Sequence, residues 1–419
     1  MPLRNPGIRN LWIAQLVSIT GDFLAIFAVL SHVSFRLHAT PAEITGVSIA
    51  YMLPLALFGP AAGVLVDRSS PRRIMVASDI LRAALVALLA VCGGLRQTYA
   101  ILFAISSVST FFLPAQAVQI RRTVPRDALA GVNAAMQQGV LIIRMASPAA
   151  AGALVSRFGP ESCFYIDAVT FLFSAAMVWH TRLGLVVVAG QPGQGRHEKR
   201  GSMREYSMGM RFIAAHRGIA FVTATMAAAT FAISCFTPLM AIFVRDILGA
   251  SVRTFGLVSA MTGVGMMAGT QAARRLAGAR QGVRRQPQAI IVFSLMVMSA
   301  GIVVLGASGS PAGAAAGAMV MGSGVGLLMV PAQTLIQSET PISLAGRVSS
   351  AVMSVISVAE ILGLMVSGVA ARGAGVRPLF FTSAAMLAAL AWKGSGWKGY
   401  GERASGCAAP EAECYRRAA

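Results

Sequence analysis

Residues 63–73 read Gly-Val-Leu-Val-Asp-Arg-Ser-Ser-Pro-Arg-Arg, a short charged segment between two long apolar stretches. The stretches, 44–66 and 74–95, are each long enough to cross a bilayer as a helix, which takes about 20 residues. Charges gathered in a short gap between two such stretches are typical of a loop at one face of a membrane. The segment therefore predicts a pair of membrane helices joined by a basic loop.

The same pattern continues along the whole chain. Of 419 residues, 56% are apolar and 12% are charged, and the mean hydropathy is +0.69; a soluble domain carries about 25% charged residues. The apolar stretches lack the alternation of barrel strands, so we expect helices. The twelfth holds only about 15 apolar residues, short of a full crossing. The predicted spans are 10–34, 44–66, 74–95, 98–119, 131–157, 162–182, 218–243, 253–273, 287–307, 314–336, 347–370 and 377–392.

The longest gap between spans divides the chain into halves. Residues 183–217 are polar and basic, with a Gln-Pro-Gly-Gln-Gly run at 191–195, which is typical of a linker. We predict an all-α polytopic membrane protein of two six-helix bundles. Its parts are an N-terminal bundle at 1–182, a linker at 183–217, a C-terminal bundle at 218–393 and a tail at 394–419.

The net charge of +20 also indicates orientation. A nucleic-acid binder gathers its basic residues on one patch, whereas here they lie in the short gaps between apolar stretches, so nucleic acid is excluded as a partner. Most Lys and Arg residues fall in the alternate gaps that would share a side with the N-terminus. By the positive-inside rule, both termini are expected in the cytoplasm.

A repeat supports two similar halves. Pro114-Ala115-Gln116 recurs as Pro331-Ala332-Gln333, an offset of roughly 216 residues, and each precedes a Leu-Ala-Gly triplet, at 129–131 and 344–346. A weaker sequence similarity relates residues 37–48 to residues 248–259, and the Gly-xxx-Gly spacing at 59–63 recurs at 265–269. Two halves related by an axis along the membrane normal are a known transporter plan. Chance similarity of Ala-rich helices is the alternative.

The charged segment at residues 63–73 carries a family resemblance. Gly63, Asp67, Arg68, Arg72 and Arg73 resemble the cytoplasmic signature of the major facilitator superfamily, G-x-L-x-D-R-x-G-R-[KR]. Two positions depart from it, with Ser70 at a glycine and Pro71 at a basic residue. The resemblance implies a gating role, in which the acid and the arginines form charge pairs that hold one transport state. A generic positive-inside loop is the alternative.

A second motif lies in the fifth predicted span. Ser147, Pro148 and Gly152 resemble the core of the superfamily's antiporter signature, with Ser and Ala at two of its glycines. A kinked, closely packed helix explains the same residues. Within the superfamily, the chain resembles the bacterial branch of enterobactin exporters and macrolide-efflux proteins. The residues that carry this likeness are Leu11-Trp12, Gly21-Asp22, Asp79–Arg82, Pro114-Ala115, Asp167-Ala168 and Ser174.

Ionisable residues inside predicted spans are functional hypotheses, because a charge in the apolar slab is costly. Asp22 lies about halfway along the first span and is the main candidate for a proton-linked or cation-binding carboxylate; a structural acid is the alternative. Arg144 and Glu360 lie near mid-depth in spans five and eleven. We expect Arg144 to face Asp22, Glu360 or a polar cavity. Glu360 is a second protonation site or gate, or a structural partner.

Two further acids lie nearer the ends of their spans. Asp79 and Arg82 are three residues apart and can pair on one helix, which favours a structural or gating pair over substrate contact. Asp167 is interpreted as structural.

The family resemblance implies secondary active export of an organic small molecule, either a drug-like compound or a siderophore. The resemblance implies alternating access with proton antiport in a bacterial inner membrane, and hence a proton gradient as the energy source and no cofactor. No Walker loop, metal-ligand spacing or nucleophile elbow stands out, so we predict no enzyme and no metal. The expected partners are the substrate and the lipid bilayer, and the chain is expected to be a monomer. Proton-coupled uptake and a non-transporting membrane sensor remain the rival functions.

Overall fold

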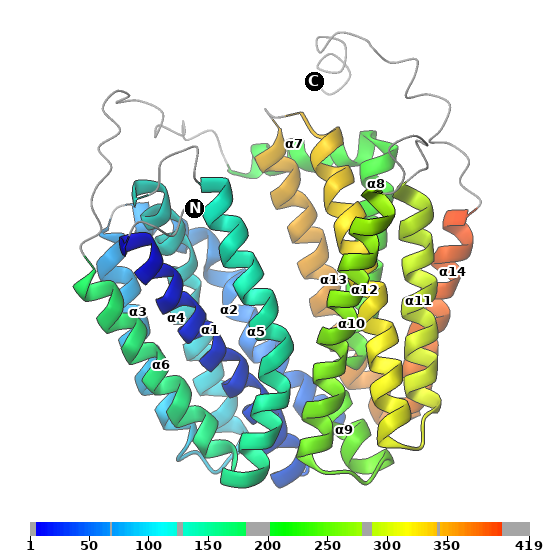
Figure 1. The fold of residues 1–419 in the computed structure, drawn as a ribbon, viewed down its shortest axis with the longest axis horizontal. Coiled ribbons are helices and arrows are strands. Elements are labelled where there is room, and N and C mark those ends of the chain that lie inside the picture. The colour runs from blue at the N-terminus through cyan, green and yellow to red at the C-terminus, as the bar shows by residue number, and fades with distance from the viewer. Residues whose placement is uncertain are drawn as a thin grey trace. The chain divides into compact units, whose positions relative to one another are not determined.

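A computed structural model describes residues 6–67, 69–123, 129–181, 202–278, 287–341 and 344–395. Within these ranges the chain is mostly helical and includes twelve helices of at least 19 residues (Figure 1). Six of the twelve begin at a proline, which lacks the N–H that the first turn leaves unpaired. These prolines are Pro6, Pro41, Pro71, Pro160, Pro287 and Pro311.

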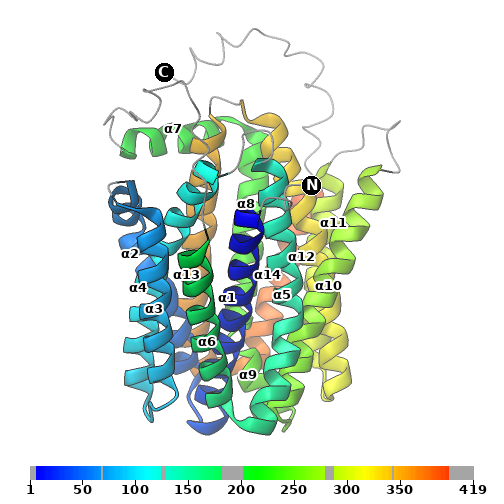
Figure 2. The same cartoon turned by 60° about the vertical axis from the view of Figure 1, so that its left-hand side comes forward.

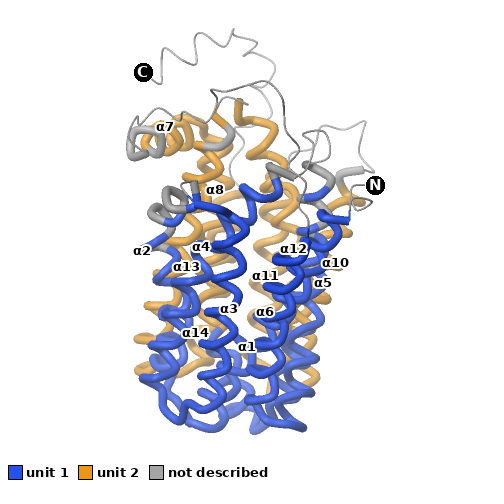
Figure 3. The backbone as a smooth tube through the Cα atoms, turned by 90° about the vertical axis from the view of Figure 1, so that its left-hand side faces the viewer, with its two compact units in different colours: residues 1–190, 238–260 blue, residues 191–237, 261–419 orange. Residues whose placement is uncertain are grey.

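The chain forms two compact units (Figure 3). Unit 1 comprises residues 1–190 and 238–260, and unit 2 comprises residues 191–237 and 261–419. The predicted limits 1–182, 183–217, 218–393 and 394–419 stay a prediction. The predicted linker contains a helix of its own at 202–215, and residues 238–260, predicted to lie in the second bundle, pack with the first.

Unit 1 is built on six long helices. In the bundle, α6 packs against α1 and α3, while α4 packs against α2 and α3, and α5 packs along α1 (Figure 2). The helices are α1 Pro6–Ser31, α2 Pro41–Asp67, α3 Pro71–Leu89, α4 Leu95–Thr123, α5 Leu129–Phe158 and α6 Pro160–His180, and a π-helical turn η2, His32–Arg36, continues α1.

Unit 2 repeats this plan. Its α14 packs against α8 and α11, α11 packs against α12, and α8 packs against α13. The elements are α7 Ser202–Ala215, α8 Arg217–Phe236, α10 Val252–Gly278, α11 Pro287–Ala307, α12 Pro311–Glu339, α13 Ala345–Ala374 and α14 Val376–Ser395. Between α8 and α10 lie α9 Met240–Ile242 and a π-helical turn η3 Phe243–Ile247, and the first part of α10 belongs to unit 1.

Small residues let α10 and α12 approach closely. A Cβ built on Gly265 or Gly269 would meet the backbone of α12, and one built on Gly322 or Gly326 would meet the backbone of α10. Reciprocal glycines four residues apart are how membrane helices achieve van der Waals packing without a hydrophobic driving force. The spacing noted at 265–269 thus has a packing role.

All twelve predicted spans coincide with helices of the structure. Among the described residues, eight helical segments are long and apolar enough to cross a membrane by length and composition alone. The predicted last span was short, yet α14 continues to Ser395 and has 20 residues, which gives about 30 Å at 1.5 Å per residue. The helix begins one residue before the predicted span and continues past Lys393, which ended the apolar stretch, but α14 is not among the eight segments that are both long and apolar enough to cross.

Candidate functional site

A buried ion pair lies inside the first bundle. Asp79 and Arg82, one helical turn apart on α3, pair through Oδ1 and Nη2, and their side chains are 0% and 5% exposed. The other carboxylate oxygen, Oδ2, is buried without a hydrogen-bond partner in the described structure, and Ser174 of α6 lies beside this carboxylate. The sequence-based expectation of a pair on one helix is thus met, in the core of the bundle.

Two aromatic rings hold the guanidinium of Arg82. Its central carbon lies 4.5 Å from the ring centre of Phe112 on α4 and 4.2 Å from that of Phe171 on α6. A cation against aromatic faces gains up to about 2 kcal/mol per contact when it is desolvated. Arg82 is therefore a fixed internal cation, restrained by three helices.

A second carboxylate completes the interior of this site. Asp167 on α6 is 1% exposed, and Thr170 Oγ1 donates a 3.2 Å hydrogen bond to its Oδ1. A Cβ built on Gly21 of α1 would collide with Asp167 Oδ1 and with the Thr170 hydroxyl. Because Gly21 has no side chain, α1 can press against α6 at this level.

The next residue, Asp22, brings a third carboxyl group. It is only partly buried, and Arg82 and Asp79 are the charged groups that act on it most strongly. Tyr51 on α2, also partly buried, lies in the field of Asp22, Arg82 and Asp167. The site thus has a closed interior, formed by α3 and α6, and a more open edge, formed by α1 and α2.

We call Asp22, Asp79, Arg82 and Asp167 the charged cluster. If every group is ionised, three carboxylates face one guanidinium, an excess of two negative charges. Uncompensated charge inside a protein is expensive, so such a site favours taking up protons or another cation. In the described part of the chain, no three His, Cys, Asp or Glu side chains are placed to hold a metal ion.

Sequence reasoning found only part of this cluster. It paired Asp79 with Arg82 but treated Asp22 apart from them, and it assigned Asp167 a structural role. It gave no role to Tyr51, Phe171 or Thr170. The available signal was Gly21 beside Asp22. A glycine next to an acid inside a span indicates a close helix contact, at which a residue of the neighbouring helix can lie near the acid.

The other two predicted membrane charges lie elsewhere. Arg144 on α5 is exposed, and within the described residues it forms no ion pair with Asp22. The structure therefore does not support that pairing. Glu360 is partly exposed on α13 of unit 2 and does not belong to the charged cluster. Roles for Arg144 and Glu360 in proton coupling or in a substrate cavity stay predictions.

The charged segment at residues 63–73 lies at the junction of α2 and α3. Gly63 and Asp67 are in α2, but their surroundings and all of Arg68 fall outside the described residues, so the predicted charge pairs stay a prediction. Arg72, at the start of α3, lies with its guanidinium 5.5 Å from the ring centre of Trp179 on α6. Arg73 is exposed.

The proline motif of α5 lies at a close helix contact. Ser147 is 3% exposed, and α5 continues through Pro148 to Phe158. A Cβ on Gly152 would be 2.9 Å from the Cα of Gly256 on α10, and one on Gly256 would be 2.6 Å from the carbonyl oxygen of Pro148. This geometry supports the close-packing interpretation; a role in antiport stays a prediction.

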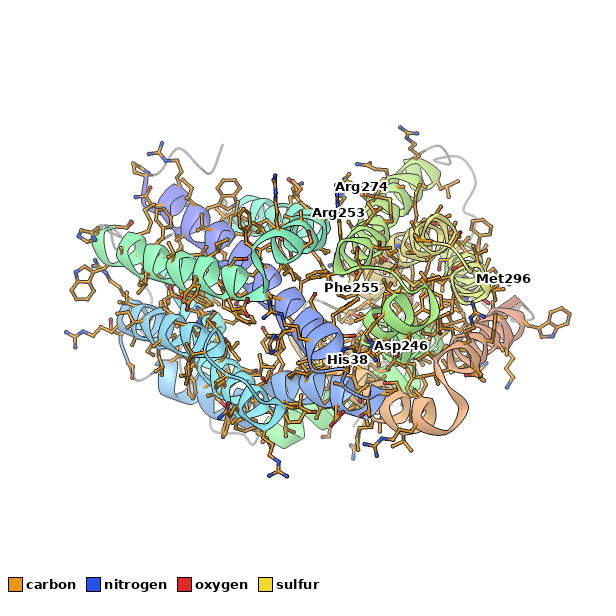
Figure 4. All side chains as sticks on the ribbon, turned by 90° about the horizontal axis from the view of Figure 1, so that it is seen from below. His38, Asp246, Arg253, Phe255, Arg274 and Met296 are labelled. Carbon is orange, nitrogen blue, oxygen red and sulfur yellow. The ribbon has the colours of Figure 1, made fainter. Side chains whose placement is uncertain are left out.

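Near this contact, the ends of two helix runs meet within unit 1. Arg245 of η3 donates to the backbone carbonyl of Ser34 in η2, and Phe27 stacks on Phe255 with ring centres 4.5 Å apart. Figure 4 views this end and labels Phe255 together with His38, Asp246 and Arg253. The two π-helical turns are counterparts in the repeat, since each ends with the same pair of backbone bonds and a residue of positive φ, at His38 and Gly249.

Comparisons with known proteins agree with this architecture. Residues 11–364 match the Major Facilitator Superfamily. The chain is 29% identical to the uncharacterized MFS-type transporter YfiS of Bacillus subtilis, over 91% of this chain and 90% of that protein. It is 24% identical to macrolide efflux protein A of Streptococcus pyogenes, over 91% of this chain and 93% of that protein.

Solved structures share the fold at low sequence identity. A bacterial homolog of the human lysosomal transporter Spinster, in an inward-facing and unoccupied conformation, gives a TM-score of 0.74 at 14% identity, covering 93% of this chain and 97% of that one. The nucleoside transporter NupG gives 0.69 at 13% identity, covering 94% of this chain and all of that one. The chain belongs to the Major Facilitator Superfamily and is a multi-pass membrane transporter with that fold.

Proposed function

We propose that this protein exports an organic small molecule from the cytoplasm in exchange for protons, by alternating access. The observation that carries the proposal is the charged cluster, in which Asp79 pairs with a guanidinium held by two aromatic rings while Asp22 and Asp167 lie in the electrostatic field of that guanidinium. Such a set is stable in water-poor surroundings when protons offset its excess negative charge. A proton gradient is then the energy source, and no resident cofactor is needed.

Each residue of the cluster has a distinct part in this proposal. Arg82 supplies a constant positive charge, because the rings of Phe112 and Phe171 hold it in place. Asp22 is on the more open edge and exchanges protons with the substrate path. Asp79 and Asp167 share the electrostatic field of Arg82 with Asp22. A proton gained or lost at Asp22 therefore changes how strongly Arg82 attracts each of the other two carboxylates.

Export is favoured over uptake by the similarity to macrolide efflux protein A. A drug-like compound or a siderophore is the proposed substrate, and the chain is proposed to act as a monomer. We place it in a bacterial inner membrane with both termini in the cytoplasm, from the distribution of its basic residues.

The test uses inside-out membrane vesicles from an efflux-deficient host, energised to acidify the lumen. A fluorescent pH probe reports the lumen, and erythromycin, a macrolide, is the first compound of a panel of drugs and siderophores. We expect an active compound to enter the vesicles and to release lumenal protons. Asp22→Asn should reduce this proton release at least about tenfold, which corresponds to roughly 1.4 kcal/mol.

Asp246→Asn is the matched control, because Asp246 is an exposed carboxylate paired with its own neighbour Arg245. This variant should transport normally. Unchanged proton release in Asp22→Asn would refute the assigned role of Asp22. Substrate leaving the vesicles together with protons would indicate uptake, and no movement of any compound in the panel would favour a membrane sensor.

A further inference from the structure

The helix inside the predicted linker has an unusual orientation. In Figures 1 and 2, α7 runs across the ends of α8 and α13, whereas those two helices run along the bundle. Only His216 separates α7 from α8, whose first residue, Arg217, begins a membrane span. A helix that turns sideways at the start of a span lies at the level of the membrane surface.

One face of α7 is fixed against its own unit. Gly209 lies on the backbone carbonyl of Arg347, at the beginning of α13, so closely that a Cβ there would collide with it. Ile213, one turn further along, is 6% exposed. At the border of this face, the guanidinium of Arg347 lies 3.9 Å from the sulfur of Met208, whose side chain is partly exposed. These contacts hold the helix in its sideways position.

The face of α7 that runs from Met208 to Arg211 is exposed and mixed in character. Met208 is 36% exposed, and Arg211 is exposed one turn later on the same side. Arg217, at the start of α8, is exposed too. Among the described side chains at this junction, the carboxylate of Glu339 lies 3.4 Å from the ring of His216, so it already has a neighbour that can carry a positive charge. The face therefore offers basic groups beside an apolar side chain.

We propose that this face of α7, together with Arg217 at the start of α8, binds the headgroups of anionic phospholipids. Arg211 and Arg217 contact lipid phosphates, and Met208 enters the boundary between headgroups and acyl chains. A helix in the plane of the interface that presents basic side chains beside an apolar one gains both electrostatic attraction to anionic lipid and burial of apolar area. Arginine suits phosphate because its planar fork can donate two parallel hydrogen bonds.

The first test is native mass spectrometry of the purified full-length protein with phosphatidylglycerol or phosphatidylcholine added at equal concentration. We expect selective retention of phosphatidylglycerol. In the double variant Arg211→Gln/Arg217→Gln this retention should fall, by about fivefold for each basic group near the surface. Inorganic phosphate at millimolar concentration should not compete, because the proposed ligand is the lipid surface.

The matched control is Arg253→Gln/Arg372→Gln, which removes two exposed arginines at the first turn of α10 and the last turn of α13. It should bind phosphatidylglycerol as the unaltered protein does. Equal losses in the two double variants would contradict the proposal, since binding would then follow net charge alone. Unchanged binding in Arg211→Gln/Arg217→Gln would contradict it as well.

A second measurement does not depend on charge. In vesicles that contain lipids brominated near the headgroup, Met208→Trp should add fluorescence that these lipids quench more than they quench the existing tryptophans. Met353→Trp, at an exposed position of α13 two turns beyond its start, is the comparison for a residue deeper in the span. Fluorescence from position 208 that only aqueous quenchers reach would overturn the interfacial placement.

Discussion

Helices α3 and α11 occupy the same place in their respective units and differ at the two positions that matter most. Both begin at a proline, Pro71 and Pro287, and counting from it aligns their buried positions. Met75 matches Ile291, and both are fully buried. Asp79 and Arg82, in contrast, match Leu295 and Met298, which are 1% and 0% exposed.

The comparison extends to α6 and α14. Each follows a glycine of positive φ, Gly159 at 79° and Gly375 at 83°, and counting from that glycine aligns Asp167 with Ser383. In α1 and α8, the register of the π-helical turns aligns Asp22 with Ile233. All three carboxyl groups and the one guanidinium of the charged cluster thus have uncharged counterparts in unit 2.

The difference between the units shows that the fold requires buried side chains at these positions, and that the charges are an additional feature of the first bundle. Unit 2 packs the same helix pairs with Leu and Met where unit 1 has an ion pair. Replacing a buried ion pair by apolar residues is often neutral or stabilising, because desolvation offsets the attraction of the charges. The charged cluster is therefore a poor candidate for a structural device and a good one for a transport function.

The largest effect is expected from changing one member of the pair. Asp79→Leu copies Leu295 into α3 but leaves Arg82 buried without its closest partner, a loss of about 3–5 kcal/mol. We expect a marked fall in the thermal stability of the detergent-purified protein, followed by fluorescence-detected size exclusion. The reciprocal variant Leu295→Asp should be similarly harmful, and a stable Asp79→Leu protein would show that Arg82 does not depend on Asp79.

A smaller effect is expected at the contact of α1 with α6. The counterpart of Gly21 in α8 is Ala232, which is fully buried. Gly21→Ala places a methyl group against Asp167 and Thr170, and such overpacking costs about 1–3 kcal/mol. The apparent Tm should fall, whereas Ala232→Gly in unit 2 should not reproduce the clash. An unchanged Tm would mean that α1 can move away from α6 freely.

The two π-helical turns provide a stabilising test. His38 has φ of 48°, a conformation that glycine adopts at little cost, and its counterpart is Gly249. The His38 side chain is exposed, so His38→Gly removes no buried contact. We expect a gain of about 1 kcal/mol in the free energy of unfolding, read as a small rise in apparent Tm. Gly249→Ala should lower it, and equal responses of the two variants would contradict the equivalence of the turns.

The smallest effect concerns a titratable group at the edge of unit 2. Burial lowers the pKa of His216, even though the Glu339 carboxylate lies 3.4 Å away. The folded state then holds fewer protons than the unfolded state as pH falls through the ordinary His pKa of about 6.5, so stability is lost toward acid pH. His216→Gln should flatten the decline of apparent Tm between pH 7.5 and 5.5, by no more than about 2 °C. A decline of equal slope in both proteins would assign it to other groups.

The sequence was sufficient for the fold and for single members of the site. Long apolar stretches separated by charged or Pro/Gly-rich gaps located the twelve helices, because length and hydropathy are local properties. The joining of Asp22, Asp79, Arg82 and Asp167 was not visible, because it depends on which faces of α1, α3 and α6 meet. The helical character of the linker was missed because residues 202–215 are too polar for a span, and α7 is held by tertiary contacts such as Gly209 on Arg347.

The most direct test of the proposed role replaces both members of the ion pair in unit 1 by the residues that occupy the same positions in unit 2. Asp79→Leu/Arg82→Met gives α3 the residues of α11. The purified protein should keep its thermal stability, because both charges of the ion pair are removed together and the remaining acids, Asp22 and Asp167, can be neutralised by binding protons. Substrate-driven proton release in inside-out vesicles should fall by at least about tenfold, as in Asp22→Asn. A folded double variant that still exchanges substrate for protons at the normal rate would contradict the assignment of transport coupling to the charged cluster.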